Sequence, residues 1–177
     1  MPYRIVITGA PASGKTEIFG RLKGHPALAG FVFLDELARR LLAENPHYRR
    51  DWAGFHREIY CRQVEREKAA GGRSFVTDRG TVDAFAFHPE TIQEVGTTLE
   101  AEYARYTLVI HLGSAAALGH EYYCRDTIRH ESAQEALRIE DALREVWQAH
   151  PGYHFIRADE DFEKKYQACC TLIEGGL

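Results

Sequence analysis

The chain has 177 residues, of which 45% are hydrophobic and 27% are charged, and its formal net charge is -4. This length is typical of one domain that buries a core without disulfides or metals, and the composition excludes disordered and fibrous classes. The acidic balance also argues against a general nucleic-acid binder, which needs a basic excess to neutralise phosphates. We therefore expect a single domain spanning residues 1–177.

Short apolar runs alternate with longer amphipathic stretches along the chain, a pattern typical of βαβ units around a parallel sheet. Five runs are each predicted to form a buried strand: 3–8, 31–35, 74–78, 107–112 and 153–157. Seven stretches are predicted to form helices: 15–23, 36–44, 51–70, 81–87, 89–103, 132–149 and 161–173. The expected fold class is α/β, with a five-stranded parallel sheet and helices on both faces.

The irregular segment 113–131 lies between the fourth predicted strand and a long helix, where a small lid over a site is expected. Arg125 and Arg129 in this segment are four residues apart, so one helical turn would place both on the same face. There they would clamp phosphates, which guanidinium groups bind well. The alternative is a solvated basic face balanced by Asp126 and Glu131.

A phosphate-binding loop is predicted between the first strand and the first helix. Its glycines allow the backbone to bend around phosphates, its N–H groups point inward, and the helix N-terminus favours negative charge. Lys15 is expected to reach the β and γ phosphates of ATP, and the Thr16 hydroxyl to bind Mg²⁺. The motif reads Gly9-Ala10-Pro11-Ala12-Ser13-Gly14-Lys15-Thr16.

Two predicted strands end in acidic residues. Asp35 and Glu36 follow the second strand, and Asp78 ends the third, so all three should lie near the phosphate site at the carboxyl edge of the sheet. We assign Asp78 to Mg²⁺, directly or through water, because phosphoryl transfer needs a carboxylate near the metal ion. Asp35 or Glu36 then holds or deprotonates the acceptor hydroxyl, and Asp78 remains an alternative base.

Three further residues are candidates for binding the acceptor substrate: Arg39, Arg79 and Asp83. Arg39 lies one helical turn after Glu36 and would meet the same cleft. Structural roles compete with these assignments. Asp35 or Glu36 would suit a helix N-cap, Asp78 and Arg79 an ion pair, and Asp83 a salt bridge to Arg79 four residues before it.

These motifs, taken in order, resemble the AAA-type P-loop family that includes the nicotinamide riboside kinase domains of NadR-like proteins. The resemblance spans nearly the whole chain and rests on four elements: residues 7–16, residues 35–39, Asp78-Arg79-Gly80 with Asp83, and Arg129-His130-Glu131. It implies a three-layer P-loop NTPase fold with an arginine-bearing lid and a kinase-like site.

The leading hypothesis is a kinase that uses ATP and Mg²⁺ to phosphorylate a nucleoside-like or other small metabolite. Lys15 and the lid arginines would stabilise the transferred charge. The alternative is a nucleotide-dependent binding module or switch that hydrolyses its nucleotide slowly. The four cysteines lack C-x-x-C spacing and residues 5–12 are too short to span a bilayer, so we expect a cytoplasmic protein with reduced thiols, monomeric or dimeric.

Overall fold

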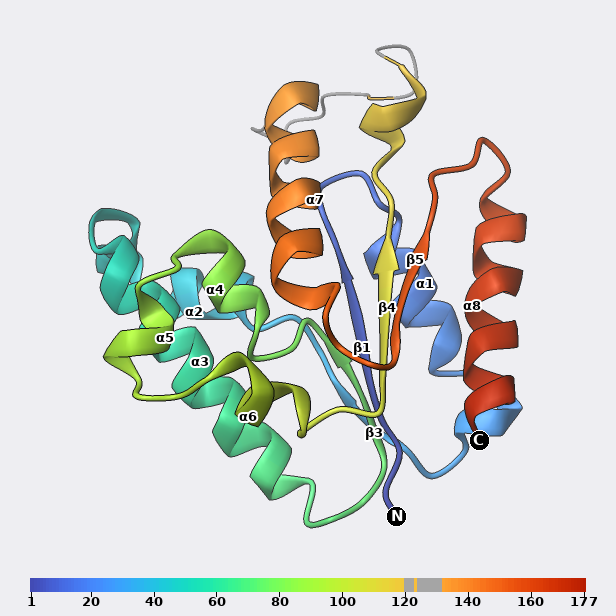
Figure 1. Cartoon of the computed structure of the whole chain (residues 1–177), viewed down its shortest axis with the longest axis horizontal. Helices are drawn as coiled ribbons and strands as arrows, with labels where there is room; N and C mark the ends of the chain where they lie inside the picture. Colours follow the sequence, from blue (N-terminus) through green and yellow to red (C-terminus); the bar gives the residue numbers. More distant parts are fainter. Residues whose placement is uncertain (120–122, 124–131) are drawn as a thin grey trace.

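The computed structural model describes residues 1–119, 123 and 132–177, and its centre is a five-stranded parallel sheet in the order β2-β3-β1-β4-β5 (Figure 1). The strands are β1 Arg4–Gly9, β2 Val32–Leu34, β3 Phe75–Asp78, β4 Leu108–Leu112 and β5 Tyr153–Ile156. All five predicted strands are confirmed to within two residues. β1 lies between β3 and β4 and runs parallel to both, so the carboxyl ends of these three strands lie side by side.

The three central strands are fully buried apart from Arg4, as predicted, but the two outer strands are not. In β2 only Leu34 is buried, and His154 of β5 is exposed. An edge strand has a neighbour on one side alone, so its side chains are covered less completely than those of β1, β3 and β4. The prediction that every strand is buried is therefore wrong for β2 and β5.

Helices flank the sheet on both faces. The α-helices are α1 Lys15–Leu22, α2 Ala38–Glu44, α3 Trp52–Ala69, α4 Asp83–Phe87, α5 Thr91–Glu94, α6 Leu99–Tyr103, α7 Ala133–Trp147 and α8 Phe162–Gly176. Three short 3-10 helices complete the described structure: η1 Pro26–Leu28, η2 Pro46–Arg50 and η3 Ala115–Leu118. The three-layer α/β architecture expected from the sequence is confirmed.

Alternating side chains of β1 build two separate cores. Ile5 and Ile7 pack with α1 and α8 on one face of the sheet, whereas Val6 packs on the other face with residues that include Trp147 of α7. Figure 1 shows α1 and α8 together on one side of the sheet and α7, α3 and α4 on the opposite side. This alternation is the period-two pattern of a strand covered on both faces.

The predicted helix 89–103 is instead two short helices, α5 and α6. Gly96 between them adopts φ +69°, a left-handed conformation that interrupts an α-helix. Thr98 then caps α6, because its hydroxyl accepts a hydrogen bond from the Ala101 N–H. The prediction failed because apolar spacing continues across Gly96 while the backbone does not.

Most of the predicted lid, including Arg125 and Arg129, lies outside the described residues. Of the segment 113–131, the structure describes residues 113–119 and the buried Tyr123. No helix in the described part of the chain is both long and apolar enough to cross a membrane.

Candidate active site

The loop predicted to bind phosphates lies between the end of β1 and the start of α1, at the carboxyl edge of the sheet. Gly14 adopts φ +77° and Ala12 adopts φ +61°. A non-glycine residue in the left-handed region is uncommon and costs on the order of 1 kcal/mol, so the surrounding structure must hold Ala12 there. A side chain at Gly9 would place its Cβ 2.8 Å from the Leu112 carbonyl oxygen, so β4 requires a glycine at this position.

Hydrogen bonds from outside the loop hold its carbonyl groups. The Ser114 hydroxyl donates to the Pro11 carbonyl at 2.6 Å, and the Ala115 N–H donates to the Ala12 carbonyl at 3.0 Å. Lys165 of α8 donates to the next carbonyl, that of Ser13, at 2.6 Å. Three consecutive carbonyls of the loop are thus hydrogen-bonded to donors that lie outside it.

Lys15, the first residue of α1, forms a buried ion pair with Asp78, the last residue of β3. The exposed fractions are 7% for Lys15 and 5% for Asp78. Burial lowers the pKa of Lys15 and the nearby charge of Arg79 lowers it further, while Asp78 and Glu36 act in the opposite direction. The Asp78 carboxylate therefore holds the Lys15 ammonium group in place beside the loop.

Thr16 and Asp78 offer the oxygen ligands that Mg²⁺ prefers, a hydroxyl and a carboxylate. Thr16 is exposed at the start of α1, one residue beyond the lysine whose ammonium contacts Asp78. A hydroxyl on the residue after Lys15 and a carboxylate in contact with Lys15 form a donor set whose chemistry fits the predicted metal ion.

Asp83 holds Arg79 beside the phosphate loop. Arg79 Nη1 donates to Asp83 Oδ1 at 3.1 Å, and Arg79 Nη2 donates to the Gly9 carbonyl at 3.2 Å. The backbone of Arg79 is left-handed, with φ +72°. The salt bridge predicted between Arg79 and Asp83 is confirmed, whereas the alternative pair of Asp78 with Arg79 is wrong, because Asp78 pairs with Lys15.

The carboxylate of Asp83 is itself surrounded by donors. Besides Arg79, it accepts hydrogen bonds from the Thr8 hydroxyl, from the Gly80 N–H at 2.9 Å and from Trp147 Nε1 at 3.2 Å. Asp83 is only 3% exposed. Its two oxygens therefore connect β1, the turn after β3 and α7.

The structure separates the two acids that follow β2. Asp35 is exposed and forms an ion pair with Lys23 at 2.5 Å, near the end of α1. Glu36 is half-buried, lies close enough to Lys15 to raise its pKa, and pairs with Arg39 at 3.4 Å. Neither acid caps α2, whose N-cap is Leu37 without a side-chain hydrogen bond, so the N-cap interpretation is wrong.

Two residues of α3 also lie beside β3, and the sequence analysis did not select them. Gln63 donates to the Thr77 hydroxyl at 2.8 Å, directly before Asp78. Arg66 is half-buried, and burial lowers its pKa while Asp35 and Asp78 raise it. Among the described residues its Nη1 atom has no hydrogen-bond partner. The only sequence signal for Gln63 and Arg66 was that both are polar and lie three positions apart on α3.

Next to Arg79 lies an aromatic cluster formed by Trp52, His56, Phe87 and His88. The Arg79 guanidinium lies 5.2 Å from the centre of the Phe87 ring, and His56 stacks on Phe87 with ring centres 5.7 Å apart. Neither nitrogen of the buried His56 ring has a hydrogen-bond partner in the described structure, and burial lowers its pKa to about 4. These contacts form one wall beside the β2–β3 side of the site.

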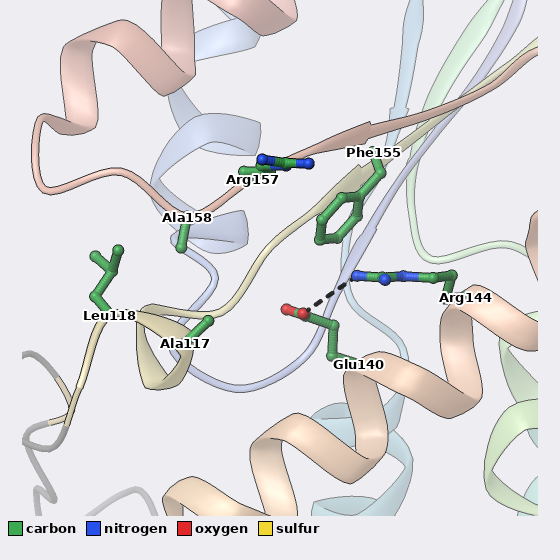
Figure 2. A pocket seen from close by; sticks show the side chains of 7 residues that line it. All are labelled: Ala117, Leu118, Glu140, Arg144, Phe155, Arg157 and Ala158. Carbon is green, nitrogen blue, oxygen red and sulfur yellow. Dashed lines mark ion pairs between the residues drawn. The ribbon is translucent and has the colours of Figure 1, made fainter.

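Two hollows lie on the opposite side, near β4 and β5. The first, about 380 Å³, is lined by side chains of α7, η3 and the β5 region; Figure 2 shows Glu140 and Arg144 facing Phe155 and Arg157 across it. Glu140 also accepts a hydrogen bond from the Ser114 N–H at 2.5 Å, which links this hollow to the phosphate loop.

The second hollow, about 440 Å³, shares Leu118 and Ala158 with the first and extends along residues 159–161 to Lys164. Asp161, which lines it, directly precedes Phe162, the first residue of α8, and a Cβ at Gly14 of the loop would lie 2.9 Å from the Phe162 ring. The loop is therefore flanked by an open hollow on the β5 side and by charged side chains on the β2 side.

Comparisons with known proteins agree with this fold. A family model described as an AAA domain matches residues 4–165. No curated protein sequence matches the chain. Among solved structures, a deoxyadenosine kinase from M. mycoides with the products dCMP and dCDP is similar, with a TM-score of 0.67 and 13% identity, covering 97% of this chain and 99% of that one. The same kinase with bound dATP gives a TM-score of 0.64 at the same identity and coverage.

Proposed function

Since the chain belongs to the AAA domain family of P-loop proteins, we propose that it is an ATP-dependent kinase of a nucleoside-like or other small metabolite. The observation that carries this proposal is the two-sided site. The phosphate loop has a hollow for the rest of a nucleotide on its β5 side and Glu36, Arg66 and Arg79 on its β2 side. An acceptor that is to be phosphorylated needs such a second set of charged side chains to bind it and to take its proton.

On the donor side, the loop N–H groups and Lys15 hold the β and γ phosphates of ATP, while the hollow beside Phe162 takes the nucleoside part. Thr16 and Asp78 would hold Mg²⁺, which would neutralise charge on the phosphate oxygens when bound. We assign Arg125 and Arg129, which lie outside the described residues, to stabilising the charge of the transferred group.

On the acceptor side, we assign Glu36 as the base. Asp35, which is exposed and pairs with Lys23, takes no part in the proposed reaction. Glu36 accepts the proton of the acceptor hydroxyl as that oxygen bonds to the γ phosphorus and the bond from phosphorus to the β,γ-bridging oxygen breaks, which releases ADP. Arg79 faces the acceptor and Arg39 orients Glu36. Asp83 does not contact the acceptor in this scheme, because its oxygens already receive four donors.

The fold similarity supports a nucleoside as the acceptor class, because the similar kinase acts on deoxyadenosine. The chain also lacks a basic excess, in keeping with a small-molecule acceptor in the cytoplasm rather than a nucleic acid.

The test is ADP release from ATP and Mg²⁺ by the wild-type protein and by Lys15→Met, with a panel of ribonucleosides, deoxynucleosides, nicotinamide riboside and small phosphorylated metabolites. One acceptor should raise the wild-type rate and leave the variant unchanged. If every acceptor leaves the rate flat while nucleotide still binds, the kinase assignment is wrong, and a switch that responds to bound nucleotide takes its place.

A further inference from the structure

Lys165 is a buried lysine of α8 that the proposed chemistry does not use. It is 6% exposed, and its ammonium group donates to two backbone carbonyls, those of Ser13 and Gly113, each at 2.6 Å. Within the described part of the chain no carboxylate forms an ion pair with it. Burying a charge this deeply is costly, because removal from water penalises the charged form. The hydrogen bonds of Lys165 to the two carbonyls offset part of this cost.

The two carbonyls come from different parts of the site. Ser13 belongs to the phosphate loop after β1, and Gly113 directly follows β4. Lys165 therefore joins the loop, the end of β4 and α8 through one atom, Nζ. Lysine is suited to this bridge because its ammonium group has three donors and no acceptor.

The bond to Ser13 also determines where the next N–H group points. The peptide between Ser13 and Gly14 is planar and trans, so its N–H points away from its carbonyl. Since the carbonyl points toward Lys165, the Gly14 N–H points in the opposite direction, away from Lys165. Among the described residues none accepts a hydrogen bond from this N–H.

We propose that Lys165 is a positioning residue for nucleotide binding: it orients the Ser13–Gly14 peptide toward the phosphates and places a buried positive charge behind the loop. This inference rests on the proposed function for the identity of the ligand. It explains why a lysine occupies the apolar stripe of α8, one turn before the buried Cys169. Burial lowers the pKa of Lys165, while Cys169 and the more distant carboxylates of Glu140 and Asp159 act in the opposite direction.

The experiment measures the affinity of the folded protein for ATP and ADP with Mg²⁺ by calorimetry. Lys165→Met keeps the alkyl chain and removes the charge and the donors, so both affinities should fall at least about tenfold. Two control variants should keep wild-type affinity. Lys68→Met removes an exposed lysine of α3, and Cys169→Ala weakens the packing of α8 without touching the loop.

Wild-type affinity in Lys165→Met would overturn the inference, as would an equal loss in Cys169→Ala, which would indicate a purely structural role. If Lys165→Met does not fold, Lys165→Leu removes the charge and the donors with a shorter apolar side chain and provides the same test. Reduced affinity in that variant supports the inference and unchanged affinity overturns it. Nucleotide affinity needs no acceptor, so a wild-type protein that binds ATP but phosphorylates nothing would refute the kinase assignment and leave this measurement intact.

Discussion

The ammonium group of Lys15 and the carboxylate of Asp78 form an ion pair that is almost completely buried, between the phosphate loop and the end of β3. In the proposed complex these charges part, because Lys15 turns to the phosphates and Asp78 to the metal ion. The pair thus keeps two costly charges satisfied until nucleotide binding supplies them with new partners.

Removing one member of this pair should destabilise the protein. Lys15→Met leaves Asp78 buried without its partner, and we expect the free energy of unfolding to fall by about 3 kcal/mol. Adding Asp78→Asn should recover much of this loss, since an amide carries no charge, while transfer activity stays absent. Urea unfolding of the two variants measures the effect. A double variant as unstable as the single one would contradict it.

Glu36 and Asp35 offer a matched comparison of adjacent acids. We expect Glu36→Gln to reduce kcat by about a hundredfold or more, because an amide cannot accept the acceptor proton. Asp35→Asn should leave kcat within about twofold, since it breaks only an exposed pair with Lys23. Steady-state kinetics with the identified acceptor measures both. The reverse order of effects would assign the base to Asp35.

Asp83 should matter for stability as well as for placing Arg79. Asp83→Ala leaves the Trp147 indole, the Gly80 N–H and the Thr8 hydroxyl without their acceptor, so unfolding should become easier by about 3 kcal/mol or more. The exposed Asp141 of α7 supplies the control, since Asp141→Asn is expected to change little. The midpoints of chemical denaturation of the two variants should therefore differ clearly. Similar midpoints would show that the hydrogen bonds to Asp83 do not stabilise the fold.

His56 should make the fold sensitive to acid. Burial, with smaller contributions from His88 and Arg79, lowers its pKa from 6.5 to about 4. The unfolded chain therefore binds a proton below pH 6.5 that the folded protein refuses until about pH 4, so stability from this group is lost as the pH falls through that window.

The variant His56→Phe removes this titration and the two unpartnered ring nitrogens. Between about pH 7.5 and about pH 5, its free energy of unfolding should fall by about 2 kcal/mol less than that of the wild type. His154→Phe, which changes an exposed histidine of β5, should follow the wild-type pH dependence. Parallel curves for His56→Phe and the wild type would show that His56 is not the group responsible.

The amino-acid sequence alone determined the five parallel strands, most of the helices and the phosphate loop. These features depend on residues close together in the chain: apolar runs form strands, and glycines followed by Lys15 and Thr16 form the loop. The same local information failed at Gly96, whose left-handed backbone ends a helix that the apolar spacing continues.

Only the tertiary structure decided which charged groups meet. It placed Asp35 against Lys23 and Glu36 near Lys15, although these acids are adjacent in sequence. It also brought Lys165 to the loop carbonyl of Ser13, 152 positions earlier in the chain. Such partners depend on the order of strands in the sheet and on which face each helix covers, and no local pattern of residues encodes the distance between them.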